Sequence, residues 1–175
     1  MKSVFLKFLY KRIDGCLGAG RINVFDQNGA IIPHTKFSIV YDGFTKDTPT
    51  TNKIFSTNNT ITNRWWTGAP ETTYFIAELD ITDITKLTKI GIRTWENTYF
   101  GKEQITVYMS HTYDGTYKQI AFLNLDASIQ GTSKMVYVNT DASTMQISKT
   151  IQTLITDAIL NHELIQHIVT GSEEK

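Results

Sequence analysis

The 175-residue chain has a single cysteine, Cys16, and no excess of charge of either sign. One cysteine excludes an intrachain disulfide. Seventeen basic and seventeen acidic residues give a formal net charge of zero. Such a chain has no electrostatic attraction for nucleic acid or for an anionic membrane surface. Because low net charge favours association, we expect other proteins or further copies of this chain as partners.

Long apolar runs are also missing. No apolar stretch approaches the roughly 20 residues that a membrane helix needs. The first ten residues are largely apolar, but Lys7 interrupts them, and Lys11 and Arg12 follow without a small-residue cleavage site. The sequence therefore predicts no signal peptide and a protein made in the cytoplasm.

Short segments of strand length, many of them alternating apolar and polar residues, are abundant and are separated by turn signals such as Asn28–Gly29 and Asp114–Gly115. Strands are predicted over residues 4–10, 21–25, 36–41, 74–81, 87–93, 104–110, 116–122 and 134–138. We expect a glycine-rich turn at 15–20 and a long surface loop over 44–64, with at most a short strand inside it. Short strands at near-regular spacing are typical of a β-sandwich or jelly roll, which we assign to residues 1–140.

Residues 141–175 differ from the rest, because apolar residues recur there at steps of three and four. This pattern predicts a C-terminal α-helix, so the predicted fold is mainly all-β, a jelly-roll β-sandwich with one appended helix. A helix with so wide an apolar face should be buried on the sandwich or against a neighbouring subunit. The candidate assembly-interface residues are Ile151, Leu154, Ile155, Ile159, Leu164 and Ile168.

The motifs that could support catalysis lack the residue spacing or the partner residues that the chemistry requires. His162 and His167 are five residues apart, which places them about 140° apart around a helix, whereas a zinc protease needs a spacing of four. The glycines at 15–20 match no phosphate-binding pattern, and no His–acid pair is evident that would activate Cys16. Asp42 and Asp47 are candidate ligands of a loop calcium site, although turn chemistry explains them equally well. We predict no enzyme and no cofactor apart from this calcium candidate.

Aromatic residues gather in the middle of the chain, at Trp65, Trp66, Trp95, Tyr99, Phe100, Tyr113 and Tyr117. Tryptophan stacks well on sugar rings and on partner proteins, because its face is apolar and its N–H donates. Some of these rings should fill the core, and we expect one of Trp65 and Trp66 to point inward and the other outward. The candidate ligand-binding residues are Arg93, Trp95, Tyr99, Phe100 and Trp66.

The order of features over residues 40–125 resembles the discoidin, or factor V/VIII type C, modules of the galactose-binding-like jelly-roll group. The residues that carry the resemblance are Asp42–Gly43, Trp65 or Trp66, Glu78–Leu79, Lys89–Ile90, Ser110, Asp114–Gly115 and Tyr117. The resemblance implies a jelly roll that binds carbohydrates, lipids or proteins through loops at one end. It also implies a possible use as a building part of bacteriophage tails and capsids.

Two functions follow from these expectations. The first is a non-catalytic structural or adhesion component of a bacteriophage particle, located in the virion and in contact with other virion proteins or copies of itself. The second is a stand-alone carbohydrate-binding module that recognises a glycan, such as one on a host surface, through exposed aromatic residues.

Overall fold

The computed structural model describes residues 2–15, 17–44, 52–56, 65–67, 71–93, 102–125 and 135–141, with the backbone alone for Ala19 and for 65–67. In these residues the chain forms ten strands and two short 3₁₀ helices. All of them belong to a unit that spans Met1–Ala142. The predicted C-terminal helix lies outside the described residues. No helix among the described residues is long and apolar enough to cross a membrane.

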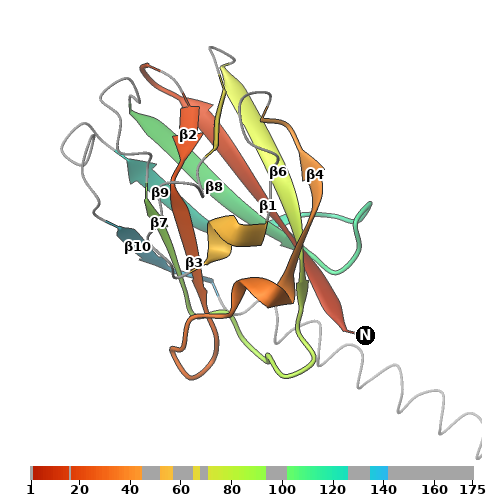
Figure 1. Cartoon of the computed structure of the whole chain (residues 1–175). Coiled ribbons are helices and arrows are strands. Elements are labelled where there is room, and N and C mark those ends of the chain that lie inside the picture. Colours follow the sequence, from red (N-terminus) through yellow and green to blue (C-terminus); the bar gives the residue numbers. More distant parts are fainter. Residues whose placement is uncertain are drawn as a thin grey trace, which may run out of the picture. The chain divides into compact units, whose positions relative to one another are not determined.

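The larger sheet has five antiparallel strands in the order β4–β6–β1–β8–β9 (Figure 1). Their bounds are β4 Phe37–Asp42, β6 Thr72–Asp80, β1 Ser3–Arg12, β8 Glu103–Ser110 and β9 Lys118–Leu125. The first strand of the chain therefore lies at the centre of the sheet. It pairs with β6 on one side and with β8 on the other, each far from it in sequence.

The smaller sheet has three antiparallel strands, β10 (Val136–Asn139), β7 (Lys89–Arg93) and β3 (Arg21–Phe25). A separate pair of three-residue strands, β2 (Leu17–Ala19) and β5 (Trp65–Thr67), belongs to neither large sheet. In Figure 1, β2 lies directly above β3, which follows it in the chain.

The hydrophobic core lies between the two large sheets, because apolar residues occupy alternate positions of their strands. The core-facing positions of β1 are Val4, Leu6, Phe8 and Tyr10, all fully buried. Those of the smaller sheet include Ile22, Val24, Ile90 and Ile92. Alternation with period two places every second side chain on the same face, and the predicted all-β sandwich is thereby confirmed.

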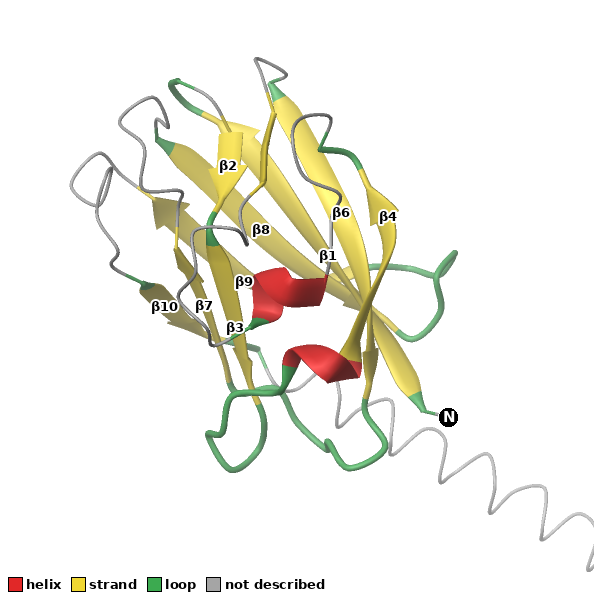
Figure 2. Cartoon of the chain, in the orientation of Figure 1, coloured by secondary structure: helices red, strands yellow, loops and turns green. Residues whose placement is uncertain are grey.

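The two long sides of the sandwich are closed differently. On one side β9 and β10 approach each other, and the Asp141 N–H donates to the carbonyl of Ile120 at 2.9 Å. On the other side the 3₁₀ helix η2 (Asn52–Phe55) fills the space between the sheets (Figure 2). The Phe55 ring stacks on Phe37 at 3.9 Å between centroids, and Phe8 is 5.9 Å away. Burial of η2 is therefore what seals this side.

The turn that joins β3 to the following segment lies at the predicted Asn28–Gly29 pair. Gly29 has φ = 75°, a conformation that residues with a Cβ adopt at a cost. The Asp26 carboxylate accepts hydrogen bonds from the N–H groups of Asn28 and Ala30, both at 2.9 Å. The predicted Asn28–Gly29 turn is thus confirmed.

Three details differ from the sequence prediction. The segment 15–20 is not only a turn, because it contains β2. The strand predicted at 116–122 runs from Lys118 to Leu125. The region 44–64 was expected to be a surface loop, yet it contains η2, whose residues Ile54 and Phe55 are buried in the core. A short second 3₁₀ helix, η1 (His34–Lys36), leads into β4.

Candidate functional site

The outer face of the five-stranded sheet carries more apolar and aromatic side chains than a solvated sheet face needs. On β1 the outward positions are Phe5, Lys7 and Leu9, which alternate with the buried core residues. The register places Tyr74 of β6 beside Leu9 and Tyr108 of β8 beside Lys7. An antiparallel sheet that faces water on one side usually shows polar residues there. This face is therefore a candidate contact surface.

Six residues on this face form what we call the outer-face aromatic row: Tyr41, Tyr74, Lys7, Tyr117, Tyr113 and Phe5. Tyr41 and Tyr74 stack with centroids 4.7 Å apart and planes 18° apart. The Lys7 ammonium lies 4.2 Å from the centroid of Tyr74 and 5.9 Å from that of Tyr117. Cation–π attraction of this kind stabilises an ammonium over a ring face.

The row continues into the turn between β8 and β9. The Tyr117 hydroxyl donates to the carbonyl of Tyr113 at 3.1 Å. The Tyr113 ring meets Phe5 edge to face, with centroids 5.9 Å apart. Burial is the first cause that raises the pKa of Tyr117 above its usual value, followed by Tyr113 and Asp114. The turn is thus held against β1 by ring contacts.

This arrangement decides what the row can offer a ligand. Because β6 lies between β4 and β1, the Tyr74 ring is contacted by Tyr41 from one neighbouring strand and by Lys7 from the other. Open rings remain at Tyr113, 42% exposed, and at Phe122 on the outer side of β9, 45% exposed. The surface therefore presents ring edges and two open rings, which can pack against a partner.

Apart from this outer surface, a buried carboxyl group lies inside the sandwich, at the end where β8 begins. Glu103 is only 1% exposed and occupies a core-facing position, in step with Ile105 and Val107. Its Oε2 accepts a hydrogen bond from the Gly18 N–H of β2 at 3.2 Å. Its Oε1 and the hydroxyl of the fully buried Tyr10 have no hydrogen-bond partner among the described residues.

Burial raises the pKa values of both Glu103 and Tyr10. Desolvation raises the pKa of Glu103 from 4.5 to about 8, and the Gly18 hydrogen bond opposes the rise. The pKa of Tyr10 is raised well above its usual value by burial first and by Glu103 second. Glu103 therefore carries its proton at neutral pH.

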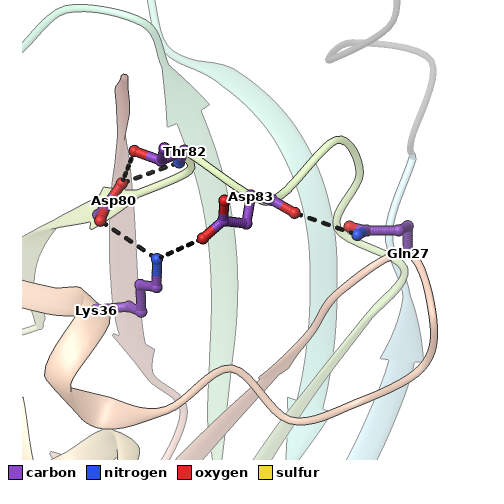
Figure 3. Close-up of polar contacts among 5 residues, drawn as sticks. All are labelled: Gln27, Lys36, Asp80, Thr82 and Asp83. Carbon is purple, nitrogen blue, oxygen red and sulfur yellow. Dashed lines mark hydrogen bonds and ion pairs between the residues drawn. The ribbon is translucent and has the colours of Figure 1, made fainter. Parts of the chain in front are cut away.

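The opposite end of β1 carries an exposed ionic network (Figure 3). The Lys36 ammonium lies 3.3 Å from carboxylate oxygens of both Asp80 and Asp83. Gln27 donates through its amide nitrogen to the carbonyl of Asp83 at 3.3 Å. These contacts tie η1 to the connection between β6 and β7, and the ammonium occupies the space between the two carboxylates.

The structure separates the predicted ligand-binding residues. Arg93 ends β7 beside Arg21 of β3, and its side chain is 6% exposed. Trp66 lies on β5, where the backbone alone is described. Trp95, Tyr99 and Phe100 lie outside the described residues, so the expected site around them stays a prediction. The expected inward and outward orientations of Trp65 and Trp66 also concern side chains that the structure does not describe.

The calcium candidate and the helix interface have a similar outcome. Asp42 is exposed, and its Oδ1 accepts a hydrogen bond from the Phe44 N–H at 2.9 Å, as turn chemistry predicts. Asp47 lies outside the described residues, as do the six candidate interface residues from Ile151 to Ile168. Across the described ranges, no three His, Cys, Asp or Glu side chains gather as a metal site would require.

Two features of the structure were missed in the sequence, although signals for them exist. Glu103 continues the alternation of Ile105, Val107 and Met109 by one step, which points it into the core. Tyr74 alternates with Thr73 and Phe75, which points it outward.

Comparison of the chain with protein-family models, curated proteins and solved structures finds no match.

Proposed function

We propose that the protein is a non-catalytic structural component that associates with further copies of itself through the outer face of its five-stranded sheet. The observation that carries this proposal is the outer-face aromatic row together with Phe122 on the neighbouring strand. The role of a bacteriophage particle component, which the resemblance to phage-borne jelly rolls implies, is the setting in which such a contact is expected.

The composition supports a second copy as the partner. The formal net charge is zero, so long-range repulsion between copies is weak. The outer face also bears charges of both signs, Lys7 on β1 and Glu78 on β6. A surface that meets its own copy across a twofold axis must be complementary to itself, and mixed charges among aromatic residues allow this.

Sedimentation velocity over two orders of magnitude in protein concentration tests the proposal. The wild-type chain should associate, and replacing Tyr113 and Phe122 together by serine should weaken association at least tenfold, since exposed aromatic residues dominate such contacts. The matched control is Ile13→Ser, which removes an apolar side chain that is 51% exposed but lies after the end of β1.

A wild-type chain that remains monomeric at the highest concentration would contradict the proposal. Equal weakening by Ile13→Ser and by the double variant would also contradict it, because association would then not depend on the outer face.

A carbohydrate-binding module is the second candidate, and the open rings of Tyr113 and Phe122 on one face favour it. It predicts binding on a glycan array that is lost in the Tyr113→Ser, Phe122→Ser variant or on replacing Trp95, Tyr99 and Phe100 by alanine. Glycan binding by a chain that stays monomeric would replace the self-association proposal with this one.

A further inference from the structure

The short strand β2 is joined to the five-stranded sheet by a side chain of the core. The Gly18 N–H, in the middle of β2, donates to the Glu103 carboxyl across 85 positions of sequence. Leu17 beside it is fully buried. The strand partner of β2 is β5, over only three residue pairs from Leu17–Thr67 to Ala19–Trp65. Among the described residues, this small sheet is held by the Glu103 bond and, next to β2, by the hydrogen bond from the Gly20 N–H to the carbonyl of Arg93 at 2.9 Å.

The groups that face Glu103 offer little stabilisation to a negative charge. Its strand neighbours are Arg12 of β1 and Leu125 of β9. The half-buried Arg12 guanidinium donates to the carbonyl of Gly15 at 3.3 Å. Tyr10 also faces Glu103 from β1, and its hydroxyl is unpartnered among the described residues. No ion pair joins Glu103 to any part of the chain that the structure describes.

The two protonation states of Glu103 therefore differ in what they require. The neutral carboxyl can remain buried with the one hydrogen bond from Gly18. The ionised carboxylate, with one backbone donor and one oxygen unpartnered among the described residues, needs further hydrogen-bond donors, which water can supply. Movement of the element that is bonded to this carboxylate would admit water to it most directly, and that element is β2.

We propose that Glu103 is a proton-controlled latch, whose neutral carboxyl holds β2 and its partner β5 on the end of the sandwich and whose ionisation detaches them. Detachment changes the surface at this end of the molecule, which includes the strand that carries Trp65 and Trp66. This inference does not depend on the proposed self-association, which concerns the outer face of the sheet.

Hydrogen exchange of the full chain between pH 5.5 and pH 9, corrected for the intrinsic pH dependence of exchange, tests the latch. The opening equilibrium of β2 should rise about tenfold per pH unit up to pH 8 and level off above it, because the detached state has an ordinary glutamate pKa. Glu103→Gln should abolish the rise. The matched control Glu78→Gln, on the outer side of β6, should retain it.

Two results would overturn the latch. One is an opening of β1 that rises in parallel with that of β2, because this would be unfolding of the whole sandwich. The other is a wild-type pH dependence that persists in Glu103→Gln. As a measurement that needs no variant, the NMR signal of the Gly18 amide should titrate with a midpoint at or below pH 8, because coupling to a detached state of ordinary glutamate pKa lowers the apparent value. A Gly18 signal that does not move between pH 5.5 and pH 9 also rejects the latch.

Discussion

Asp80 shows how a single threonine can control the acidity of a neighbouring carboxyl. Its Oδ1 accepts hydrogen bonds from both the hydroxyl and the N–H of Thr82, at 2.6 and 2.9 Å. Its Oδ2 lies 3.3 Å from the Lys36 ammonium (Figure 3). Together these partners lower the pKa of Asp80 from 3.8 to about 2, and the Thr82 hydroxyl is the largest cause. The ion pair, although conspicuous, is the smaller influence.

Replacing Thr82 by valine, which keeps the shape and removes the hydroxyl, should therefore raise the pKa of Asp80 more than Lys36→Met does. An NMR titration of the aspartate side chains measures both values. A larger rise in Lys36→Met would show that the ammonium, and not the hydroxyl, dominates this site. The stability that Asp80 contributes is present above pH 3.8 and is lost as the pH falls toward 2, because its folded-state pKa is the lower one.

At the scale of elements, η2 is the smallest piece of regular structure with a large share of the core. Its two buried residues, Ile54 and Phe55, close the sandwich on the side of β3 and β4. The Phe55 ring contacts Phe37, Phe8 and Phe75, so it joins β4, β1 and β6. Removing it leaves a cavity that none of these strands can fill alone.

We expect Phe55→Ala to lower the free energy of unfolding by about 3 to 5 kcal/mol. The exposed Lys53 in the same turn provides the control, since Lys53→Ala should change the stability by less than about 0.5 kcal/mol. Urea denaturation of both variants measures the difference. Equal losses would mean that η2 acts through its backbone and not through the ring of Phe55.

The elements that could be predicted are those whose pattern is local. Alternation of apolar and polar residues predicted β3, β7 and β8. A short apolar run predicted β1, and a segment rich in aromatic and branched residues predicted β6, all close to their observed bounds. The elements β2 and η2 could not be predicted, because each depends on partners distant in sequence. Gly18 needs Glu103 to hold β2 in place, and Phe55 needs Phe37 and Phe75 around it.

For the same reason, the candidate contact surface could be predicted only in part from the sequence. Tyr113 and Tyr117 belonged to the aromatic cluster seen in the sequence, yet Tyr41, Tyr74 and Lys7 join them from three strands that the sequence keeps far apart. Only the order β4–β6–β1 brings these side chains together. A one-residue shift in any register would have pointed them into the core.

For the whole molecule, the raised pKa of Glu103 sets the dependence of stability on pH. Between pH 4.5 and pH 8 the unfolded chain has ionised this group while the folded chain keeps its proton. The free energy of unfolding should then fall by about 1.4 kcal/mol per pH unit, a total of roughly 5 kcal/mol. If β2 detaches first, the fall is smaller, because the opened native state already hydrates Glu103.

Denaturation by urea at a series of pH values tests this expectation. The wild-type protein should be most stable near pH 4 to 5. Below this range the stabilising contribution of ionised Asp80 is lost, and above it the unfolded state is favoured because Glu103 ionises there first. Glu103→Gln should flatten the alkaline side and leave the acidic side unchanged. A wild-type curve that rises from pH 5 to pH 8 would show that Glu103 is ionised in the folded state.

The central place of β1 has a consequence for how the protein is made. Its register partners begin at Thr72 on β6 and at Glu103 on β8, so a growing chain exposes the strand before either neighbour exists. At roughly 5 to 20 residues per second, the interval between Lys11 and its partner Thr72 lasts several seconds. During synthesis, Val4, Leu6 and Phe8 therefore form an unprotected apolar edge that invites pairing between nascent chains, and folding of the sheet cannot be completed until most of the sandwich has left the ribosome.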